Sequence, residues 1–266
     1  MFKRETYTIN GQVLTEPRSY QLLISLCLII LTGLALKVTD FEFDLLMKNG
    51  SKFFTILTSM FPPNWEFMDN IWKAIIETIQ MSVIGSFLGA LVSIPFSVWA
   101  ASNITRQPFI NAFFKLILSI FRTLPTMVIA LIATFIFDIG ATAGTVAVFL
   151  FSLSYVGKLM YEHIENIEMG PFEAMESMGM TRVEAFRFAV VPQLLPTFLS
   201  ISLFNFEGNI RYSAVLGYVG AGGIGQLINT HISWRNYPAV GMILLTLMLV
   251  VFIIEQMSQH FRKRLT

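Results

Sequence analysis

Residues 170–196, GPFEAMESMGMTRVEAFRFAVVPQLLP, form a charged, glycine-punctuated segment between two long apolar runs. Gly170 and Pro171 suit the start of a helix, because a proline in the first turn lacks only an N–H that has no helical partner there. Gly179 suits the end of that helix, because glycine adopts the left-handed conformation at low cost. The pattern therefore predicts a short helix between Pro171 and Gly179.

A second short helix is predicted directly after this glycine. Thr181 and Glu184 have the T-x-x-E spacing of a capping box, in which each residue satisfies a free backbone N–H of the other. Pro192 is expected to end this second helix and to start the next apolar run. The segment is therefore predicted to be a pair of short helices joined at Gly179.

The composition of the chain requires a membrane environment. Of its 266 residues, 55% are hydrophobic and 13% are charged, whereas soluble domains carry about 25% charge. The net charge of +1 provides no basic field for phosphate backbones, so no nucleic-acid partner is expected. The single Cys27 excludes a disulfide framework and a cysteine-rich metal site. His163, His231 and His260 lie far apart in the sequence, so neither a metal nor a cofactor is expected.

Six stretches are apolar over the length needed to cross a bilayer, which is roughly 20 residues. They are residues 20–37, 72–100, 112–137, 142–162, 193–214 and 238–258. The predicted fold class is an all-α integral membrane protein with six transmembrane helices. Residues 38–71 mix apolar side chains with charge and are predicted to form helices at the outer interface, in contact with lipid. No small-residue cleavage site follows the first apolar run, so this run is expected to be a retained anchor.

The distribution of basic residues predicts the orientation of these helices. With both termini in the cytoplasm, the leader 1–19, the loop 163–192 and the tail 259–266 hold more lysine and arginine than the outer segments. With only five spans, the RKR cluster at 262–264 would lie outside, and the excess of basic residues on the cytoplasmic side would be reduced. The transmembrane core 72–258 would then carry the loop 163–192 on its cytoplasmic side.

An apolar stripe is predicted on the first helix of this loop. Phe172, Met175 and Met178 recur at helical spacing. A cytoplasmic protrusion has no lipid in which to bury such a stripe. A soluble protein partner is therefore expected.

The same loop resembles the EAA loop of bacterial ABC-importer permeases, whose pattern is E-A-A, three residues, G, nine residues and I-x-L-P. The matching positions are Glu173, Ala174, Met175, Gly179, Ala189, Val191 and Pro192, with the methionine, the second alanine and the valine as departures. In that family the loop is a coupling helix that docks in a cleft of a separate ATPase subunit. The resemblance implies this role for Phe172, Glu173, Ala174, Met175, Glu176, Met178 and Gly179. The alternative is an ordinary amphipathic loop that rests on the membrane face.

The last third of the chain resembles the phosphonate-importer permeases. Their pattern F-E-x-N-x-R-x-x-x-V-L-G-x-V-G-A-G-G-I-G is matched by residues 206–225, and FRTLP at residues 121–125 resembles a further R-x-x-P element of the family. The resemblance covers roughly residues 75–258 and implies a type I ABC-importer permease. It also implies a homodimer, two ABC ATPase subunits, an extracytoplasmic phosphonate-binding protein and a location in the bacterial inner membrane.

Polar residues within the apolar runs are candidates for a transport path. Arg122 lies in the third run, and the fifth run contains Asn205, Glu207, Asn209 and Arg211. An arginine at mid-bilayer costs about 2.5–3.5 kcal/mol on insertion scales, so it is expected to face a cavity or a partner. Glu207 and Arg211 have the i,i+4 spacing of an ion pair on one helix face. One hypothesis is a path for a phosphorus oxyanion, and the alternative is that these groups only stabilise helix packing.

Residues 220–225, GAGGIG, match the dinucleotide fingerprint G-x-G-x-x-G, but their context excludes that interpretation. The fingerprint needs a βαβ unit and an acidic residue about 20 positions later, and here none occurs before Glu255. The stretch is predicted to be a flexible loop on the outer side. The candidate outer gate is formed by Gly220, Gly222, Gly223 and Gly225. A close-packed turn is the alternative.

The sequence contains no G-x-x-x-x-G-K-[ST] motif, so the chain is not expected to hydrolyse ATP, and no catalytic residue is assigned. Three function classes compete: an ABC-importer permease for phosphonate or a related oxyanion (phosphite or phosphate), a methionine- or phosphate-type ABC permease, and a secondary transporter or intramembrane enzyme. The third class would show inverted repeats with broken helices, or a nucleophile with its base. We expect the first class, working by alternating access.

Overall fold

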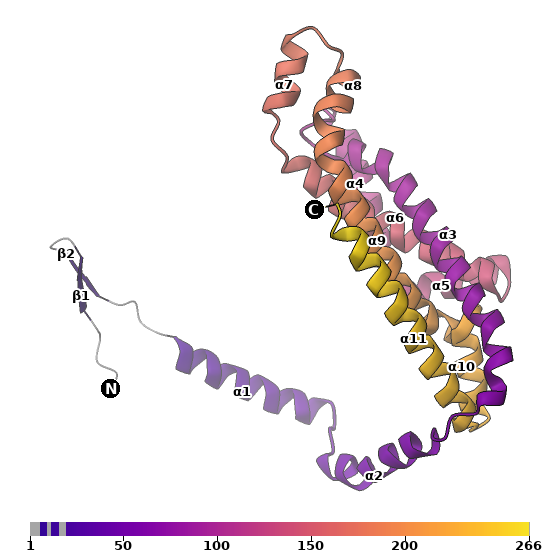
Figure 1. Ribbon diagram of the computed structural model, residues 1–266. Helices are drawn as coiled ribbons and strands as arrows, with labels where there is room; N and C mark the ends of the chain where they lie inside the picture. Colours follow the sequence, from indigo (N-terminus) through magenta and orange to yellow (C-terminus); the bar gives the residue numbers. More distant parts are fainter. Residues whose placement is uncertain (1–5, 10–11, 16–19, 266) are drawn as a thin grey trace. The chain divides into compact units, whose positions relative to one another are not determined.

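The computed structural model describes residues 6–9, 12–15 and 20–265. They fall into two compact units, Met1–Thr55 and Ile56–Thr266 (Figure 1). Helices account for almost all of the regular structure, which confirms the all-α fold class. The second unit contains every residue proposed above for coupling, transport or gating.

The first unit contains a short hairpin, an apolar helix and most of a second helix, which ends four residues beyond the unit boundary. Strands β1 (Thr6–Ile9) and β2 (Gln12–Thr15) pair antiparallel within the predicted leader, where the sequence analysis expected no strand. Helix α1 (Gln21–Val38) has no buried residue, as expected for a helix that is apolar on all sides and faces lipid. Helix α2 (Phe43–Ser59) lies in the segment predicted to rest at the outer interface, and that location stays a prediction.

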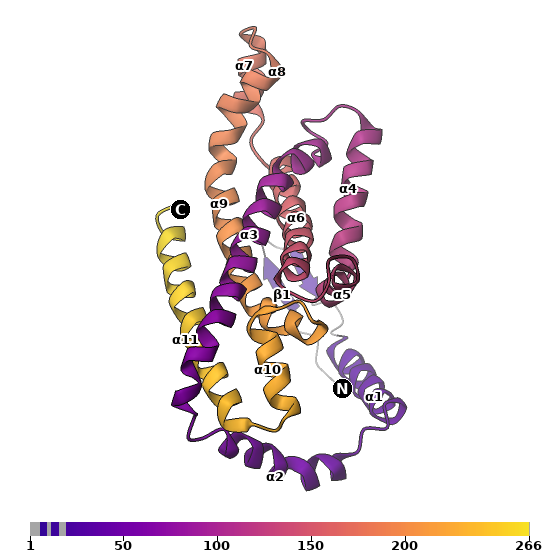
Figure 2. The same ribbon diagram turned by 90° about the vertical axis from the view of Figure 1, so that its right-hand side faces the viewer.

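The second unit is a helical bundle. Its elements are η1 (Trp65–Phe67), α3 (Met68–Ala100), α4 (Pro108–Thr123), α5 (Thr126–Phe137), α6 (Ala141–Glu165), α7 (Gly170–Ser177), α8 (Arg182–Ala185), η2 (Phe186–Val190), α9 (Val191–Leu216), η3 (Gly217–Val219), α10 (Gly223–Ser233) and α11 (Tyr237–Arg262). Figures 1 and 2 show α3, α6, α9 and α11 side by side, with α7 and α8 projecting beyond one end.

Glycines allow α3 and α6 to pack closely at the centre of this bundle. A Cβ atom on Gly85 would lie 2.7 Å from Cγ1 of Val148, and one on Gly89 would lie 2.6 Å from Cβ of Ser152. Neither position has room for a side chain, since real Cβ contacts below 3.0 Å are essentially never seen. The small residues therefore set the distance between the two central helices.

The third predicted span, residues 112–137, is not one straight helix. Helices α4 and α5 meet at an angle of 92°. Pro125 lies at the break, where it supplies no N–H for a continuous helix and restricts the residue before it to an extended conformation. Among the described residues, five helices are long and apolar enough to cross a membrane, and this bent pair would make the sixth span. Arg122 lies in the last turn of α4, directly before this break.

The helix after Thr181 does not end at Pro192. It continues through a five-residue π-helix, Phe186–Val190, directly into α9, which places Pro192 in the first turn of the new helix. A proline inside a regular helix clashes with the carbonyl four residues earlier. The wider π turn accommodates the missing N–H without stopping the chain. Helix α8 of the projecting pair is therefore continuous with the bundle helix α9.

Candidate functional site

The projecting helical pair is formed by α7 and α8, as the sequence predicts. Gly179 between them has φ of +89°, in the left-handed region that favours glycine. Thr181 Oγ1 accepts a hydrogen bond from the backbone N–H of Glu184 at 3.4 Å, and Glu184 Oε2 accepts one from the backbone N–H of Thr181 at 2.9 Å. The predicted capping box is confirmed.

The predicted apolar stripe on α7 is divided between the bundle and the surface. Phe172 is only 3% exposed and belongs to the same apolar cluster as Val156, Ile164 and Val190. Met178, by contrast, is 71% exposed at the far end of the helix. Phe172 therefore anchors α7 to its own bundle and is not accessible to a partner.

The remaining residues of the predicted coupling set lie at or near the surface. Glu173, Ala174 and Gly179 are exposed, whereas Met175 and Glu176 are half-buried. An ion pair of 3.1 Å between Arg182 Nε and Glu176 Oε1 joins α8 to α7.

Two further apolar side chains, Met180 and Val183, are exposed near the tip of the pair, at 39% and 78%. The sequence analysis missed them because they lie outside the α7 stripe. Together with Met178 they form an apolar tip.

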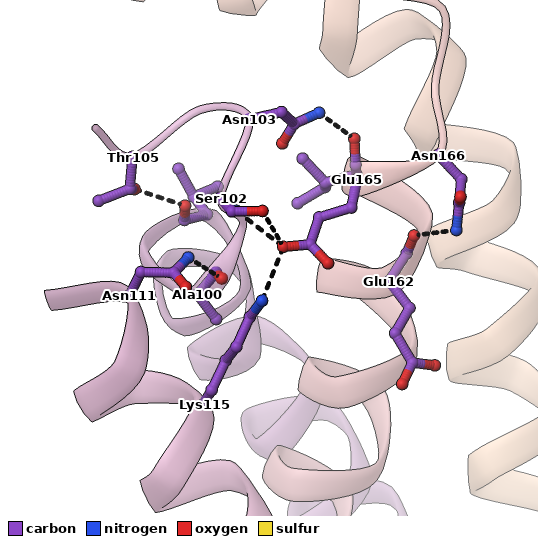
Figure 3. Close-up of polar contacts among 11 residues, drawn as sticks. Ala100, Ser102, Asn103, Thr105, Asn111, Lys115, Glu162, Glu165 and Asn166 are labelled. Atoms are coloured by element: carbon purple, nitrogen blue, oxygen red, sulfur yellow. Dashed lines mark hydrogen bonds and ion pairs between the residues drawn. The ribbon is translucent and has the colours of Figure 1, made fainter. Parts of the chain in front are cut away.

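A polar clasp at the base of α7 ties several elements together (Figure 3). Glu165, the last residue of α6, accepts hydrogen bonds from the Ser102 backbone N–H at 2.8 Å and from Ser102 Oγ at 2.6 Å. Lys115 Nζ of α4 lies 2.8 Å from the same carboxylate oxygen. Asn103 Nδ2 donates to the carbonyl of Ile164 at 2.6 Å. The loop after α3, the helix α4 and the end of α6 are thus joined directly below the projecting pair.

Asn205 and Asn209 lie in a buried polar layer between α3, α6 and α9. Asn205 Nδ2 donates to Ser152 Oγ at 2.9 Å, and Asn209 Nδ2 donates to Ser152 Oγ and to Ser86 Oγ, both at 2.8 Å. All four residues are less than 5% exposed. These bonds give the two buried amide nitrogens acceptors and fix the register of the three helices.

Glu207 forms ion pairs with two arginines. Arg211 Nη2 donates to Glu207 Oε1, which confirms the pair expected from the i,i+4 spacing. Arg262 Nη2, at the end of α11, donates to Glu207 Oε2 at 3.2 Å. The sequence analysis placed Arg262 in a cytoplasmic tail and missed this contact, because 55 positions separate the two residues and no local pattern joins them.

A pocket of about 390 Å³ opens beside this cluster, between α6 and α9. It is lined by Phe151, Tyr155, Phe204, Asn205, Gly208, Arg211 and Tyr212. The guanidinium of Arg122 stands over the ring of Tyr155 at 5.6 Å from its centroid. Of the five residues predicted to form a transport path, Asn205 and Arg211 line the pocket, Glu207 pairs with Arg211, and Arg122 contacts the pocket wall. Asn209 lies in the buried layer.

The glycine-rich stretch is a buried turn and not a loose outer loop. Residues 221–225 are all buried. A Cβ atom on Gly222 would lie 2.7 Å from the backbone nitrogen of Ala141, and one on Gly223 would lie 2.6 Å from Thr78 Oγ1. The close-packed turn that the sequence analysis gave as the alternative fits these contacts with α3 and α6, and the gate stays a prediction. Any gating movement of Gly220, Gly222, Gly223 and Gly225 would first have to open these contacts.

Within the described part of the chain, no group of three or more histidine, cysteine, aspartate or glutamate side chains could hold a metal ion. His231 is buried between the rings of Phe67 and Trp234, at centroid distances of 4.6 Å and 5.8 Å.

Comparison with known proteins places these features in context. Residues 93–266 match the family described as binding-protein-dependent transport system inner membrane component. The phosphate-import permease protein PhnE of Mycolicibacterium smegmatis is 32% identical over 79% of the chain, which spans 40% of that relative's length. The phosphite transport system permease protein PtxC of Stutzerimonas stutzeri is 30% identical over 79% of the chain and 76% of its own length.

A similar fold is found in a solved structure. A chain of the MetNI methionine ABC transporter, in an inward-facing conformation, superimposes with a TM-score of 0.68 over 76% of this chain and 99% of its own length. The two sequences are 22% identical, so this likeness concerns the arrangement of helices. It supports the type I permease architecture expected from the sequence.

Proposed function

The chain belongs to the family of binding-protein-dependent transport system inner membrane components, and from this membership we propose that it is the transmembrane permease subunit of an ABC importer for phosphonate or a related phosphorus oxyanion. Phosphite and phosphate belong to the same chemical class. The observation that carries the substrate class is the similarity to the phosphate and phosphite permeases, at 32% and 30% identity. The chain spans only part of the first of these, so its substrate is a proposal.

A methionine-type ABC permease is the second candidate. The MetNI structure favours it through the arrangement of helices alone. Two arginines at or beside the pocket, Arg122 and Arg211, suit an anion better than a zwitterionic amino acid. We therefore prefer the phosphorus oxyanion.

The proposed energy source is a separate ABC ATPase, two copies of which would engage two copies of this chain. The surface proposed for docking is α7 with the apolar tip of Met178, Met180 and Val183, which is exposed and lies at the end of the projection. Phe172 would pass a movement of α7 into the bundle, because its ring packs in the bundle core. The clasp around Glu165 would carry the same movement to α4.

The proposed mechanism is alternating access. ATP would bring the ATPase subunits together, the two projecting pairs would move with them, and the bundles would open outward to receive the anion from an extracytoplasmic binding protein. Release of ADP would reverse the motion. This mechanism requires a multi-pass chain in a bacterial inner membrane with both termini in the cytoplasm, and that orientation is part of the proposal.

The proposed function is tested by transport in proteoliposomes that contain the full chain, its ATPase subunit and the binding protein. We expect ATP-dependent uptake of phosphite, phosphate or methylphosphonate, and none of methionine. The variant Gly179→Pro tests the coupling. It should distort the turn between α7 and α8 and abolish uptake while membrane insertion persists. Uptake of methionine alone, or uptake of the anion without the ATPase, would contradict the proposal.

A further inference from the structure

The carboxylate of Glu207 has two positively charged partners. It is shared by Arg211 and Arg262, so two guanidinium groups face one carboxylate. An arginine paired alone with a glutamate would be a poor ligand for an anion. Because Arg262 also binds this carboxylate, Glu207 keeps a partner when Arg211 turns to another anion.

The two arginines differ in exposure. The side chain of Arg262 is 25% exposed and lies over the ring of Phe204 at 5.5 Å, whereas that of Arg211 is 52% exposed and lines the pocket. Glu207 itself is only 5% exposed and cannot easily follow a ligand outward. Arg211 is therefore the partner that can exchange Glu207 for another anion, while Arg262 keeps the buried carboxylate neutralised.

One residue of the pocket wall contains a buried acceptor for which the described part of the chain supplies no donor. Asn205 lines the pocket, and its buried Oδ1 atom has no hydrogen-bond partner among the described residues. A buried acceptor without a donor is costly unless a ligand or water supplies one. A phosphorus oxyanion that keeps one acidic proton presents both complementary groups, namely negative oxygens for the guanidinium and a P–OH for the amide oxygen.

We propose that the pocket between α6 and α9 binds a protonated tetrahedral phosphorus oxyanion, with Arg211 as its charged ligand. In this arrangement Arg262 is a positioning residue that holds Glu207 and so releases Arg211. The proposal rests on the proposed function for the identity of the anion. Gly208 leaves room for the ligand, since the nearest atom to a built Cβ there is Cε2 of Tyr212, at 3.9 Å. A phospholipid headgroup carries the same phosphate chemistry, and the experiment distinguishes a bound lipid from a bound free anion.

Cysteine protection tests the site in the full chain, purified in detergent with its ATPase subunit. Cys27 is the only cysteine, so Cys27→Ser provides a clean background. Tyr212→Cys places a thiol in the pocket, and Tyr218→Cys is the matched control, because Tyr218 has a similar exposure (48% against 56%) and does not line the pocket. Inorganic phosphate or phosphite is expected to slow maleimide labelling at residue 212 and not at residue 218, relative to chloride at equal ionic strength. Adding Arg211→Gln should remove the protection.

A double-variant comparison tests the role of Arg262. In Arg262→Gln, Glu207 keeps a single partner and should hold Arg211, so protection by phosphate is expected to be lost. In Arg262→Gln with Glu207→Gln, the competing carboxylate is gone and protection should return. If Arg262 had only a structural role, the double variant would show less protection than Arg262→Gln, because it loses more contacts. If the double variant does not assemble, Arg262→Lys decides, since its retained charge should preserve protection.

Equal labelling of residue 212 with and without phosphate, in a preparation whose parent chain still takes up the anion, would overturn the pocket site and leave the proposed function standing. Absence of anion uptake by the parent chain would remove the proposed function itself. Protection by dihexanoyl phosphatidylglycerol but not by phosphate would assign the pocket to a lipid headgroup and overturn the proposal. Loss of protection in Arg262→Gln that the double variant fails to restore would reject the role given to Arg262.

Discussion

At the scale of single residues, glycines decide how the end of α9 is built. A Cβ atom on Gly217 would lie 2.1 Å from the backbone nitrogen of Gln226, and one on Gly225 would lie 2.0 Å from the carbonyl oxygen of Ala214. In both cases the neighbouring atom belongs to the backbone and cannot rotate away. The turn between α9 and α10 therefore exists only because these positions carry no side chain.

We predict that Gly225→Ala lowers the free energy of unfolding by about 3 kcal/mol, at the upper end of overpacking effects, because a backbone contact cannot be relieved by a rotamer change. The matched control is Gly208→Ala in α9, where the nearest atom lies 3.9 Å away and no clash arises. Thermal unfolding of the detergent-solubilised chain measures both. Equal melting temperatures for the two variants would contradict the packing seen at this turn.

At the scale of elements, the two ends of α7 differ in burial. Phe172 near its start is buried in the apolar cluster that includes Val156 and Val190, and Met178 directly after its end is exposed. Apolar spacing alone puts both on one stripe, but the stripe passes from the bundle core to the tip. Phe172 therefore anchors the start of α7, and the proposed docking would fall to the exposed residues at its other end.

We predict that Phe172→Ala destabilises the chain by about 3–5 kcal/mol, the usual cost of emptying a buried aromatic site. Met178→Ala, at an exposed position, should change stability by no more than about 0.5 kcal/mol. It should nevertheless weaken co-purification with the ATPase subunit, because it removes apolar surface from the proposed docking tip. Thermal unfolding and pull-down of the ATPase provide the two readouts. Unchanged melting of Phe172→Ala, or full ATPase recovery with Met178→Ala, would contradict this division.

At the scale of the whole molecule, the proposed coupling requires α7 to lie in the cytoplasm. The helices α3, α6, α9 and α11 lie side by side, and α7 and α8 extend past their end (Figure 2). The basic residues of the loop, Arg182 and Arg187, favour the cytoplasmic side. Orientation is thus a property of the chain in its membrane that a single measurement can test.

We predict that Ser177→Cys, in a Cys27→Ser background, reacts with a membrane-impermeant maleimide in inside-out vesicles and not in intact spheroplasts. Ser177 is exposed and lies in α7, so access is limited by the membrane and not by packing. Lys48→Cys, in the segment predicted to be outside, is the control and should show the reverse pattern. Labelling of residue 177 from the outside would remove the basis for docking to a cytoplasmic ATPase.

Local patterns in the sequence determined much of this architecture. Apolar runs of sufficient length predicted the helices, because a bilayer requires every backbone polar group to be satisfied within the segment. Capping residues and Gly179 predicted the pair α7 and α8, since such signals act between residues a few positions apart. The spacing of Glu207 and Arg211 predicted their ion pair for the same reason.

Contacts between distant segments were decided only by the tertiary structure. The bond from Arg262 to Glu207, the burial of Phe172 and the close packing of residues 221–225 each depend on which helices become neighbours. The break at Pro125 and the π turn before Pro192 are also tertiary outcomes, because a proline can end, bend or open a helix and the surrounding packing selects among these. Sequence patterns report the local energetics of the backbone, whereas burial and charge pairing depend on atoms brought together by the fold.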